Sequence, residues 1–311
     1  MVHGYKGFEP NMTCQGFQYG VGQTYEHDGN IGLCESGFHF CRKMADVLNY
    51  YNGSDCRYAV VEALGKVING GNKSVTDRIR IVRELTKAEV FDAMYAQNGL
   101  ELKDLSFPAD EIIKARKSGK LDDLLPSGTE FPVQFANGER NVLVVCRDRD
   151  HTYLVAKYLM AEPFAMNGIW TNEGGWPACR MREHVQSIYD MLPEDIRKVI
   201  VPMHIRQTTQ GEVVECDDLA FLLSTVNVFG NDAWAPETDC DDSQIDIFRE
   251  TAVRIKKIPG ASSASWWWLR SARDDSNFYY VNTDGSTGDY FAYFEGGVAV
   301  GFCIENQKIQ K

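Results

Sequence analysis

The stretch that decides the fold of this chain begins with Trp-Trp-Trp-Leu-Arg-Ser at residues 266–271. A tract made almost wholly of Asp, Ser, Asn, Thr, Gly and Tyr follows as far as Phe294, and the apolar run Gly-Val-Ala-Val-Gly-Phe-Cys-Ile closes it at 297–304. The two apolar runs predict buried strands that hold both ends of the tract in place. Tyr, Ser, Gly and Asn also dominate adaptable binding surfaces. Since no catalytic motif of comparable strength occurs elsewhere, the tract is the first candidate for a binding surface.

The candidate ligand-contacting side chains lie inside this tract. Tyr offers a large contact area with few rotatable bonds, the short polar side chains add hydrogen bonds, and an Arg adds a forked donor. The predicted ligand-binding set is Arg273, Asp274, Asp275, Ser276, Asn277, Tyr279, Asn282, Asp284, Ser286, Thr287, Asp289, Tyr290 and Tyr293. The predicted scaffold beneath it is Trp267, Trp268, Arg270, Gly301 and Phe302. Because alternate residues of a strand point to opposite faces, one of the three consecutive tryptophans is expected to reach the surface.

Length and composition favour a globular protein with more than one core. The chain has 311 residues, of which 44% are hydrophobic and 24% charged, as is usual for soluble domains. A chain of this length can form two domains. Its net charge of -12 argues against a nucleic-acid partner, which would require an excess of Lys and Arg. The local basic residues Arg78, Arg80 and Arg83 alternate along an expected strand, and we interpret them as a solvated face.

The N-terminus and the cysteines bear on location and chemistry. The first residues lack a charged region followed by an apolar one, so no secretory signal is expected. No apolar run approaches the roughly 18 residues that span a bilayer, so no membrane insertion is expected. The nine cysteines include no Cys-x-x-Cys pair. We therefore expect reduced, mostly buried thiols, no metal centre and no cofactor. The alternative is a metal site formed by Cys34, His39 and Cys41, but zinc usually uses more closely spaced paired ligands.

Patterning in the first part of the chain predicts a mixed α+β domain. Strands are expected at 16–22, 38–41, 58–65 and 79–85, and a helix at 43–51. Thr86 and Glu89 form a capping-box pattern that opens a helix through Gln97. Another short helix is expected to begin at Pro108 and end near 118. The charged, turn-rich stretch 117–128 places the domain boundary between residues 120 and 121, giving domains 1–120 and 121–311.

The second part is predicted to hold more strands. Asn137-Gly138 marks a hairpin between strands within 131–145. Apolar spacing predicts a helix at 181–191, and Pro193 opens a short one to 200. Further elements are expected at 219–223, at 253–255, in a hairpin centred on 283–285, and in a closing strand at 298–304.

Several motifs of this second part together resemble a known family. They are Leu-Pro-x-x-Ile-x-x-x-Ile at 192–200, Trp-Trp-Leu-Arg-Ser at 267–271, Tyr-Val-Asn-x-Asp-Gly-Ser at 280–286 and Gly-Val-x-x-Gly-Phe-Cys-Ile at 297–304. They resemble a domain family of uncharacterised function, common in phage and gut bacterial proteins, over about residues 126–311. The resemblance implies a C-type-lectin-like fold, of the type found in formylglycine-generating enzymes.

Members of that fold include the variable proteins of diversity-generating retroelements. In those proteins an error-prone reverse transcriptase randomises template adenines, and the codons concerned cannot yield Lys, Glu, Gln, Met or Trp. None of these five residues occurs between 271 and 294. The resemblance implies a hypervariable ligand-binding surface for a protein or glycan on a target cell. A constant lectin-like surface is the alternative, because turn chemistry alone depletes Lys and Met.

The first part resembles another uncharacterised phage and bacterial domain over residues 5–85. Its layout of a strand, Gly-Phe-His at 37–39 and a helix ending in Tyr-Tyr is loosely similar to ADP-ribosyltransferases. In that alternative His39 and Glu84 would be the functional residues. A formylglycine-generating-type oxidase is the other enzyme alternative, but such enzymes use two close cysteines, and here Cys303 follows Cys240 only distantly.

Two further sequence patterns resemble cation-dependent sites, but neither predicts one here. Glu9-Pro10-Asn11 matches a calcium-dependent sugar motif but lies in the wrong domain. The acidic residues Asp239, Asp241, Asp242 and Asp246 fit no known cation loop, and we interpret them as a solvated turn. The prediction is thus a non-enzymatic binding protein, without catalytic residues, in a phage virion or the bacterial cytoplasm; homo-oligomerisation stays open.

Overall fold

The computed structural model describes residues 2–51, 53, 55–96, 107–230, 239, 241–259, 261 and 263–306. The chain divides into two compact units, Met1–Asp104 with Gly260–Ser263, and Leu105–Pro259 with Ala264–Lys311. The sequence had placed this boundary later, between residues 120 and 121. The difference arises because Ala109 and Ile112, which the prediction assigned to the first domain, pack into the hydrophobic core of the second unit.

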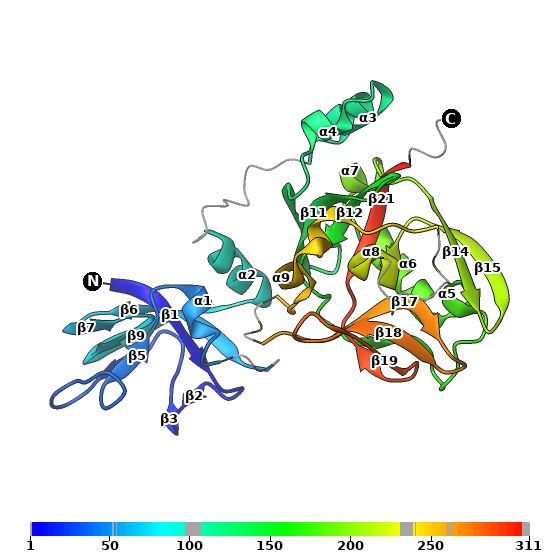
Figure 1. The fold of residues 1–311 in the computed structure, drawn as a ribbon. Helices are drawn as coiled ribbons and strands as arrows, with labels where there is room; N and C mark the ends of the chain where they lie inside the picture. Colours follow the sequence, from blue (N-terminus) through cyan, green and yellow to red (C-terminus); the bar gives the residue numbers. More distant parts are fainter. Residues whose placement is uncertain are drawn as a thin grey trace. The chain divides into compact units, whose positions relative to one another are not determined.

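The first unit is built around an antiparallel sheet with the strand order β1-β6-β9-β4. These strands are β1 (Val2–Phe8), β6 (Arg57–Ala63), β9 (Arg78–Leu85) and β4 (Thr24–Glu26). A second sheet has the order β5-β8-β7, with β5 (Phe38–Phe40), β8 (Lys73–Thr76) and β7 (Val67–Gly70). The hairpin strands β2 (Thr13–Cys14) and β3 (Phe17–Gln18) and the helices α1 (Met44–Val47) and α2 (Lys87–Ala96) complete the unit (Figure 1).

Three local predictions for this unit can be compared with the structure. The expected strand at 16–22 is limited to Phe17–Gln18, because Gln15 and Gly16 have φ of 50° and 78° and form a turn. The expected helix at 43–51 is limited to Met44–Val47, where Lys43 provides no side-chain cap. The capping box is confirmed, because the Thr86 backbone N–H donates to Glu89 Oε2 at 2.9 Å and the Glu89 N–H donates to Thr86 Oγ1 at 3.2 Å. The predicted end of that helix at Gln97 lies outside the described residues.

The basic alternation on β9 is confirmed as a surface face. Arg78, Arg80 and Arg83 are exposed, whereas Ile79 and Ile81 between them are fully buried. The three guanidinium groups form ion pairs with Glu26, Glu62 and Glu89 respectively. Exposed pairs of this kind add little stability, so their role is to solvate one side of the sheet.

The second unit is centred on a five-stranded antiparallel sheet with the order β10-β11-β12-β21-β16. Its strands are β10 (Glu130–Gln134), β11 (Arg140–Arg147), β12 (His151–Ala156), β21 (Val300–Asn306) and β16 (Phe221–Leu222). The predicted Asn137-Gly138 hairpin joins β10 to β11, and Gly138 takes φ of 86°. Every residue of β12 is buried, so both faces of the sheet are covered.

Smaller sheets and short helices surround this sheet (Figure 1). The remaining strands are β13 (Phe164–Ala165), β14 (Met203–Thr209), β15 (Glu212–Asp218), β17 (Trp267–Arg273), β18 (Asn277–Val281), β19 (Thr287–Phe291) and β20 (Glu295–Gly296). The helices are α3 (Ala109–Lys117), α4 (Leu121–Leu124), α5 (Gly175–Ala178), α6 (Arg180–Asp190), α7 (Glu194–Arg197), α8 (Thr225–Phe229), the 3-10 helix η2 (Asp246–Arg249) and α9 (Thr251–Arg254). The helix predicted at 181–191 is confirmed by α6, which buries Met181, Val185 and Ile188 at helical spacing.

The structure confirms the α+β class. Its elements are 20% helix and 39% strand, and all the strand pairings are antiparallel among the described residues. Within the described ranges, no helix combines the length and the apolar character that crossing a membrane requires. The same residues contain no group of three or more His, Cys, Asp or Glu placed to hold a metal ion.

Candidate functional site

The tryptophan run forms a buried frame beneath the candidate surface. Trp267 and Trp268 are both fully buried, whereas Trp266 is half-buried. Each buried indole N–H is satisfied, by Arg254 O at 2.9 Å for Trp267 and by Phe164 O at 3.2 Å for Trp268. Consecutive residues can both be buried because β17 is covered on its two faces. Only Trp266 therefore approaches the surface, as predicted for one of the three.

The other scaffold residues also lie in the core. Phe302 is fully buried in β21, and neighbouring Gly301 pairs with Val155 on one side and Phe221 on the other. A Cβ at Gly301 would lie 3.2 Å from the Phe221 ring, so the strand packs closely against β16.

Arg270 is a buried cation that organises the acidic segment near residue 240. It is 1% exposed and donates to Leu222 O at 2.8 Å and to Asn227 Oδ1 at 3.1 Å, and it forms an ion pair with Asp242. Asp239 is fully buried and accepts from Ser271 Oγ. The interpretation as a solvated acidic turn was wrong for Asp239, which is buried, and for Asp242, which pairs with the buried guanidinium of Arg270. Asp241 is exposed, as predicted.

The candidate surface itself is the three-stranded sheet β17-β18-β19 with its two turns. All thirteen predicted ligand-binding residues are exposed or half-buried. The exposed ones are Arg273, Asp274, Asp275, Asp284, Ser286, Tyr290 and Tyr293, and the half-buried ones are Ser276, Asn277, Tyr279, Asn282, Thr287 and Asp289. The sheet does not bring them to one face. Strand register places Tyr279 opposite Asp289, and Phe278 opposite Tyr290, so the two pairs point to opposite sides.

One side of this sheet carries a polar cluster. Arg273 forms an ion pair with Asp289, and Asn277 Nδ2 donates to Asp289 Oδ2 at 2.7 Å. The guanidinium of Arg273 also lies 5.9 Å from the ring centre of Tyr279. The four side chains therefore satisfy one another across three strands.

The other side carries an aromatic cluster. Trp266 lies at ring-centre distances of 4.9 Å from Trp268, 5.1 Å from Tyr280 and 6.2 Å from Tyr290, all edge-on. Edge-on contacts at such distances are favourable for aromatic rings. Gly288 is required here, because a Cβ would lie 2.6 Å from the Tyr280 ring.

The two turns of the sheet are held by aspartates. Asp274, with φ of 45°, accepts through Oδ1 from the backbone N–H groups of Ser276 at 3.0 Å and Asn277 at 3.1 Å. Asp284 Oδ1 accepts from the Ser286 N–H at 2.9 Å and the Ser286 hydroxyl at 2.6 Å, and these bonds lower the pKa of Asp284. Both carboxylates thus shape the backbone as well as facing solvent.

An exposed aromatic ridge continues from β19. It consists of Tyr290, Phe291, Tyr293 and Phe294. Ring centres are 4.2 Å apart for Tyr290 and Phe294, 5.9 Å for Phe291 and Tyr293, and 4.5 Å for Tyr293 and Phe294. Tyr290, Phe291 and Tyr293 keep between 41% and 45% of their surface exposed. These three rings are therefore accessible to a ligand.

A loop from residues far away in the sequence, the 167–172 loop, is anchored to this ridge. The Asn167 N–H donates to Ala292 O at 2.9 Å, and the Asn172 N–H contacts Asp275 O at 3.4 Å. Between these anchors, Ile169 and Trp170 are 64% and 68% exposed. The loop therefore carries two large exposed apolar side chains between one backbone bond to Ala292 and another to Asp275.

Asn172 supports the first turn of the sheet, which joins β17 to β18. It is fully buried, and its Nδ2 donates to the carbonyl oxygens of Arg273 and Asp274 at 2.9 Å and of Asn277 at 2.8 Å. Its Oδ1 accepts from Gln210 Nε2 at 2.9 Å. Asn172 thereby contacts only main-chain atoms of the turn.

Sequence reasoning missed Ile169, Trp170 and Phe291 as surface residues. Phe291 lies within the predicted tract and carried the same aromatic signal as its neighbours. The 167–172 loop gave no signal of its own, since its position depends on a contact with Ala292 more than a hundred residues later.

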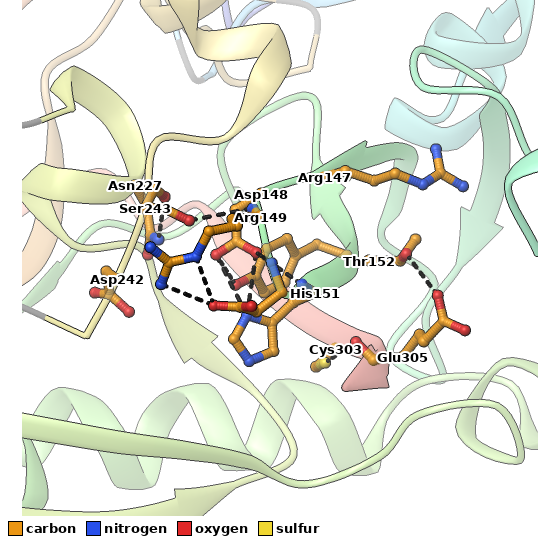
Figure 2. A network of polar contacts seen from close by, with 12 residues as sticks. Arg147, Asp148, Arg149, His151, Thr152, Asn227, Asp242, Ser243, Cys303 and Glu305 are labelled. Atoms are coloured by element: carbon orange, nitrogen blue, oxygen red, sulfur yellow. Dashed lines mark hydrogen bonds and ion pairs between the residues drawn. The ribbon is translucent and has the colours of Figure 1, made fainter. Parts of the chain in front are cut away.

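A second polar cluster lies at the turn between β11 and β12 (Figure 2). The Asp148 carboxylate accepts from the His151 N–H at 2.7 Å and the Tyr153 hydroxyl at 2.8 Å, and lies 3.1 Å from His151 Nδ1. Burial opposes ionisation, but these hydrogen bonds outweigh it and lower the pKa of Asp148. Nearby Cys303 is buried, donates to Glu305 O at 3.1 Å, and burial raises its pKa to about 12. Its thiol is thus protonated at neutral pH, which suits a structural network.

The residues considered for an N-terminal transferase are engaged in structural contacts. His39 Nε2 accepts from the Cys34 N–H at 2.9 Å, and burial, followed by the charge of Lys6, lowers its pKa. Glu84 forms a two-point ion pair with Arg57, with N–O distances of 2.7 and 2.6 Å. Cys240, the other cysteine of the oxidase alternative, lies outside the described residues.

The fold and the surface together define a class: an α+β protein of two units, the second of which presents an aromatic ridge on a buried tryptophan frame. Residues 149–306 match a family model described as a domain of unknown function (DUF6273). This match spans just over half of the chain, so the chain belongs to that family. Residues 2–93 match a second model, likewise described as a domain of unknown function (DUF7666). No curated protein and no solved structure matches the chain.

Proposed function

We propose that this protein is a non-enzymatic binding protein whose second unit recognises a protein or glycan through the aromatic ridge and the 167–172 loop. The observation that carries the proposal is the exposure of four aromatic rings, three on β19 and the residues after it and one on a loop whose backbone is bonded to Ala292. Trp170, Tyr290, Phe291 and Tyr293 all belong to this region, together with Ile169. Large exposed apolar patches are rare on proteins without a partner, and mark interaction sites.

The physical properties of this region favour binding. Trp and Tyr contribute most to binding energy at interfaces, because they bury a large area and lose little rotamer freedom. The ridge rings contact one another, and one of them, Tyr290, also contacts the aromatic cluster of Trp266 and Tyr280. A ligand would therefore meet side chains that are already ordered, which lowers the entropic cost of association.

Polar groups at the edge of the ridge would add orientation. Asp275 is exposed, and its carbonyl is close to the 167–172 loop. Asn and Asp side chains beside aromatic rings provide hydrogen bonds for sugar hydroxyls as well as for peptide groups. Both ligand classes therefore stay within the proposal.

The fold proposed for the second unit is C-type-lectin-like, and the proposed origin of its surface is a diversity-generating retroelement of phage or bacterial origin. Two features support this. The tract between 271 and 294 lacks the five residues that adenine-directed changes of the relevant codons cannot produce. In addition, Asn172 holds the first turn through carbonyl oxygens, so its support does not depend on which side chains the turn carries.

The binding face can be tested with matched surface variants. The test variant carries Trp170→Ser, Tyr290→Ser and Tyr293→Ser. The control carries Leu124→Ser and Val213→Ser, which remove apolar side chains of the same unit that are 39% and 51% exposed. The labelled full chain is applied to a printed glycan array and to a display library of bacterial surface proteins. We expect selective binding that falls at least about tenfold in the test variant and is unchanged in the control. Equal binding by wild type and test variant would contradict the proposal.

Variation of the surface is tested separately by sequencing. Deep sequencing of the gene in a population of its source should find amino-acid changes concentrated at adenine-containing codons of 271–294. The codons of the frame residues Trp267, Trp268 and Phe302 provide the internal control. A uniform rate of change over the two sets would leave a constant binding surface and remove the retroelement from the proposal.

A further inference from the structure

Lys6 is a buried ammonium in the first unit. It is 4% exposed, and its Nζ donates to His39 O at 3.0 Å and lies 5.6 Å and 5.2 Å from the ring centres of Phe8 and Tyr19. None of the ion pairs formed among the described residues involves Lys6. A buried cation is costly unless a negative group compensates it. The remaining neighbour of Lys6 is therefore the candidate for the group that compensates its charge.

That neighbour is the thiol of Cys14. Its Sγ lies 3.2 Å from Lys6 Nζ and 2.9 Å from the Tyr51 hydroxyl. Burial first, and then the hydrogen bond to Cys14, raise the pKa of Tyr51. The hydroxyl is therefore protonated and donates to the sulfur. Two donors, one of them cationic, converge on one sulfur atom, which is the arrangement that stabilises a sulfur anion.

The backbone fixes these three side chains in place. Cys14 ends β2 in a hairpin whose two turn residues, Gln15 and Gly16, both have positive φ, as tight two-residue hairpin turns require. The ring of Tyr51 lies against Gly7, where a Cβ would be 2.5 Å from its atoms. Cys14 and Tyr51 are half-buried, so this site lies at the surface of the unit, whereas the ammonium of Lys6 is buried.

We propose that Cys14 is a peroxide-reactive thiol, activated by Lys6 and Tyr51, and that the first unit thereby carries a redox-sensitive site. The cysteine sulfur attacks one oxygen of hydrogen peroxide, an S–O bond forms and the O–O bond breaks. The sulfur is oxidised to a sulfenic acid, and the departing hydroxide takes a proton from solvent and leaves as water. A small thiol reverses the change: it displaces water to give a mixed disulfide, and a second thiol releases Cys14.

Three buried cysteines of the chain lie in environments that favour the neutral thiol, whereas the exposed Cys34 has Lys73 as a hydrogen-bond partner. Burial raises the pKa of Cys41 to about 11 and those of Cys179 and Cys303 to about 12. Cys56 is half-buried in the same unit as Cys14 and has no lysine among its hydrogen-bond partners in the described part of the chain. It is therefore the internal reference for reactivity.

The experiment measures the rate of sulfenic-acid formation in the full chain at pH 7. The protein is treated with hydrogen peroxide in the presence of dimedone, and labelling of the Cys14 and Cys56 peptides is followed by mass spectrometry. Because two hydrogen-bond donors, one of them cationic, contact its sulfur, Cys14 should react about tenfold faster than Cys56. Lys6→Met and Tyr51→Phe should each lower the Cys14 rate, with the larger loss for Lys6→Met. Lys66→Met, which changes an exposed lysine of the same unit, should leave it unchanged.

The outcomes separate activation from simple exposure. Circular dichroism establishes whether each variant is folded. Tyr51→Phe retains the ring that packs on Gly7, so this variant tests the activation of Cys14 even when Lys6→Met does not fold. Faster labelling of Cys14 that falls in the folded variants supports the proposal. A Cys14 rate no higher than that of Cys56, or one that folded Tyr51→Phe leaves at the wild-type value, overturns it.

Discussion

Lys256 is a buried cation beneath the tryptophan frame, and replacing it by Met should remove a pH dependence from the stability of the second unit. The side chain is 4% exposed. Its Nζ donates to Ala156 O at 2.6 Å and to Lys157 O at 3.3 Å, and lies 5.6 Å and 5.5 Å from the ring centres of Phe248 and Trp267. Burial lowers its pKa from 10.5 to about 8.

The size and sign of the effect follow from proton linkage. The unfolded chain binds this proton more tightly than the folded one, so stability rises with pH between the folded and unfolded pKa values. A difference of roughly 2.5 pH units corresponds to about 3 kcal/mol, at about 1.4 kcal/mol per unit. About 2 kcal/mol of this should be recovered between roughly pH 6.5 and pH 9.5.

The assay is urea unfolding followed by tryptophan fluorescence. All six tryptophans lie at residue 170 or later, so the signal reports on the second unit. The free energy of unfolding of Lys256→Met is subtracted from that of the wild type at each pH, which cancels other titrating groups. The difference should shift by about 2 kcal/mol in favour of the wild type as the pH rises. Lys198→Met, at a lysine whose side chain is 55% exposed, should show a constant difference. A flat difference for Lys256→Met would refute the argument.

Three further substitutions test other contacts of the second unit, each by urea unfolding. Asn172→Asp removes the donors that hold the first turn and places a carboxylate against carbonyl oxygens. We expect the free energy of unfolding to fall by about 2–4 kcal/mol, whereas the control Ser276→Ala should lower it by less than about 0.5 kcal/mol. Equal losses in the two variants would contradict this role of Asn172. Arg270→Met leaves the Asp242 carboxylate without its cation and should cost about 3–5 kcal/mol, whereas a neutral result would mean that the pair is dispensable. Asp148→Ala should cost about 2–3 kcal/mol at neutral pH. Because the folded pKa of Asp148 is lowered, this advantage of the wild type should be complete above about pH 4 and decrease as the pH falls further. An advantage that is the same at all pH values would contradict the assigned hydrogen bonds.

The parts of the fold that sequence alone predicted depend on local chemistry. The Thr86 and Glu89 capping box and the Asn137-Gly138 hairpin involve residues at most three positions apart. The amphipathic spacing of α6 likewise reports only on one helix. Such signals lie within a few residues of one another, so no knowledge of the tertiary structure is needed.

The parts that sequence did not predict depend on distant partners. Asp242 reads as a surface residue until Arg270, 28 positions later, is placed beside it. Trp170 is part of the candidate surface only because its loop is tied to Ala292. Similarly, the polar and aromatic sides of the sheet could not be separated without the strand register, since a shift by one residue exchanges the two sides.

The way in which Asn172 reaches its partners has a practical consequence. It contacts peptide oxygens, which every amino acid possesses. Foreign peptides could thus be grafted into the turn between β17 and β18 with its course preserved, provided that Asp274 is kept, because its carboxylate accepts from two backbone N–H groups and its φ is positive. The second unit is in this respect a ready scaffold for engineered loop libraries.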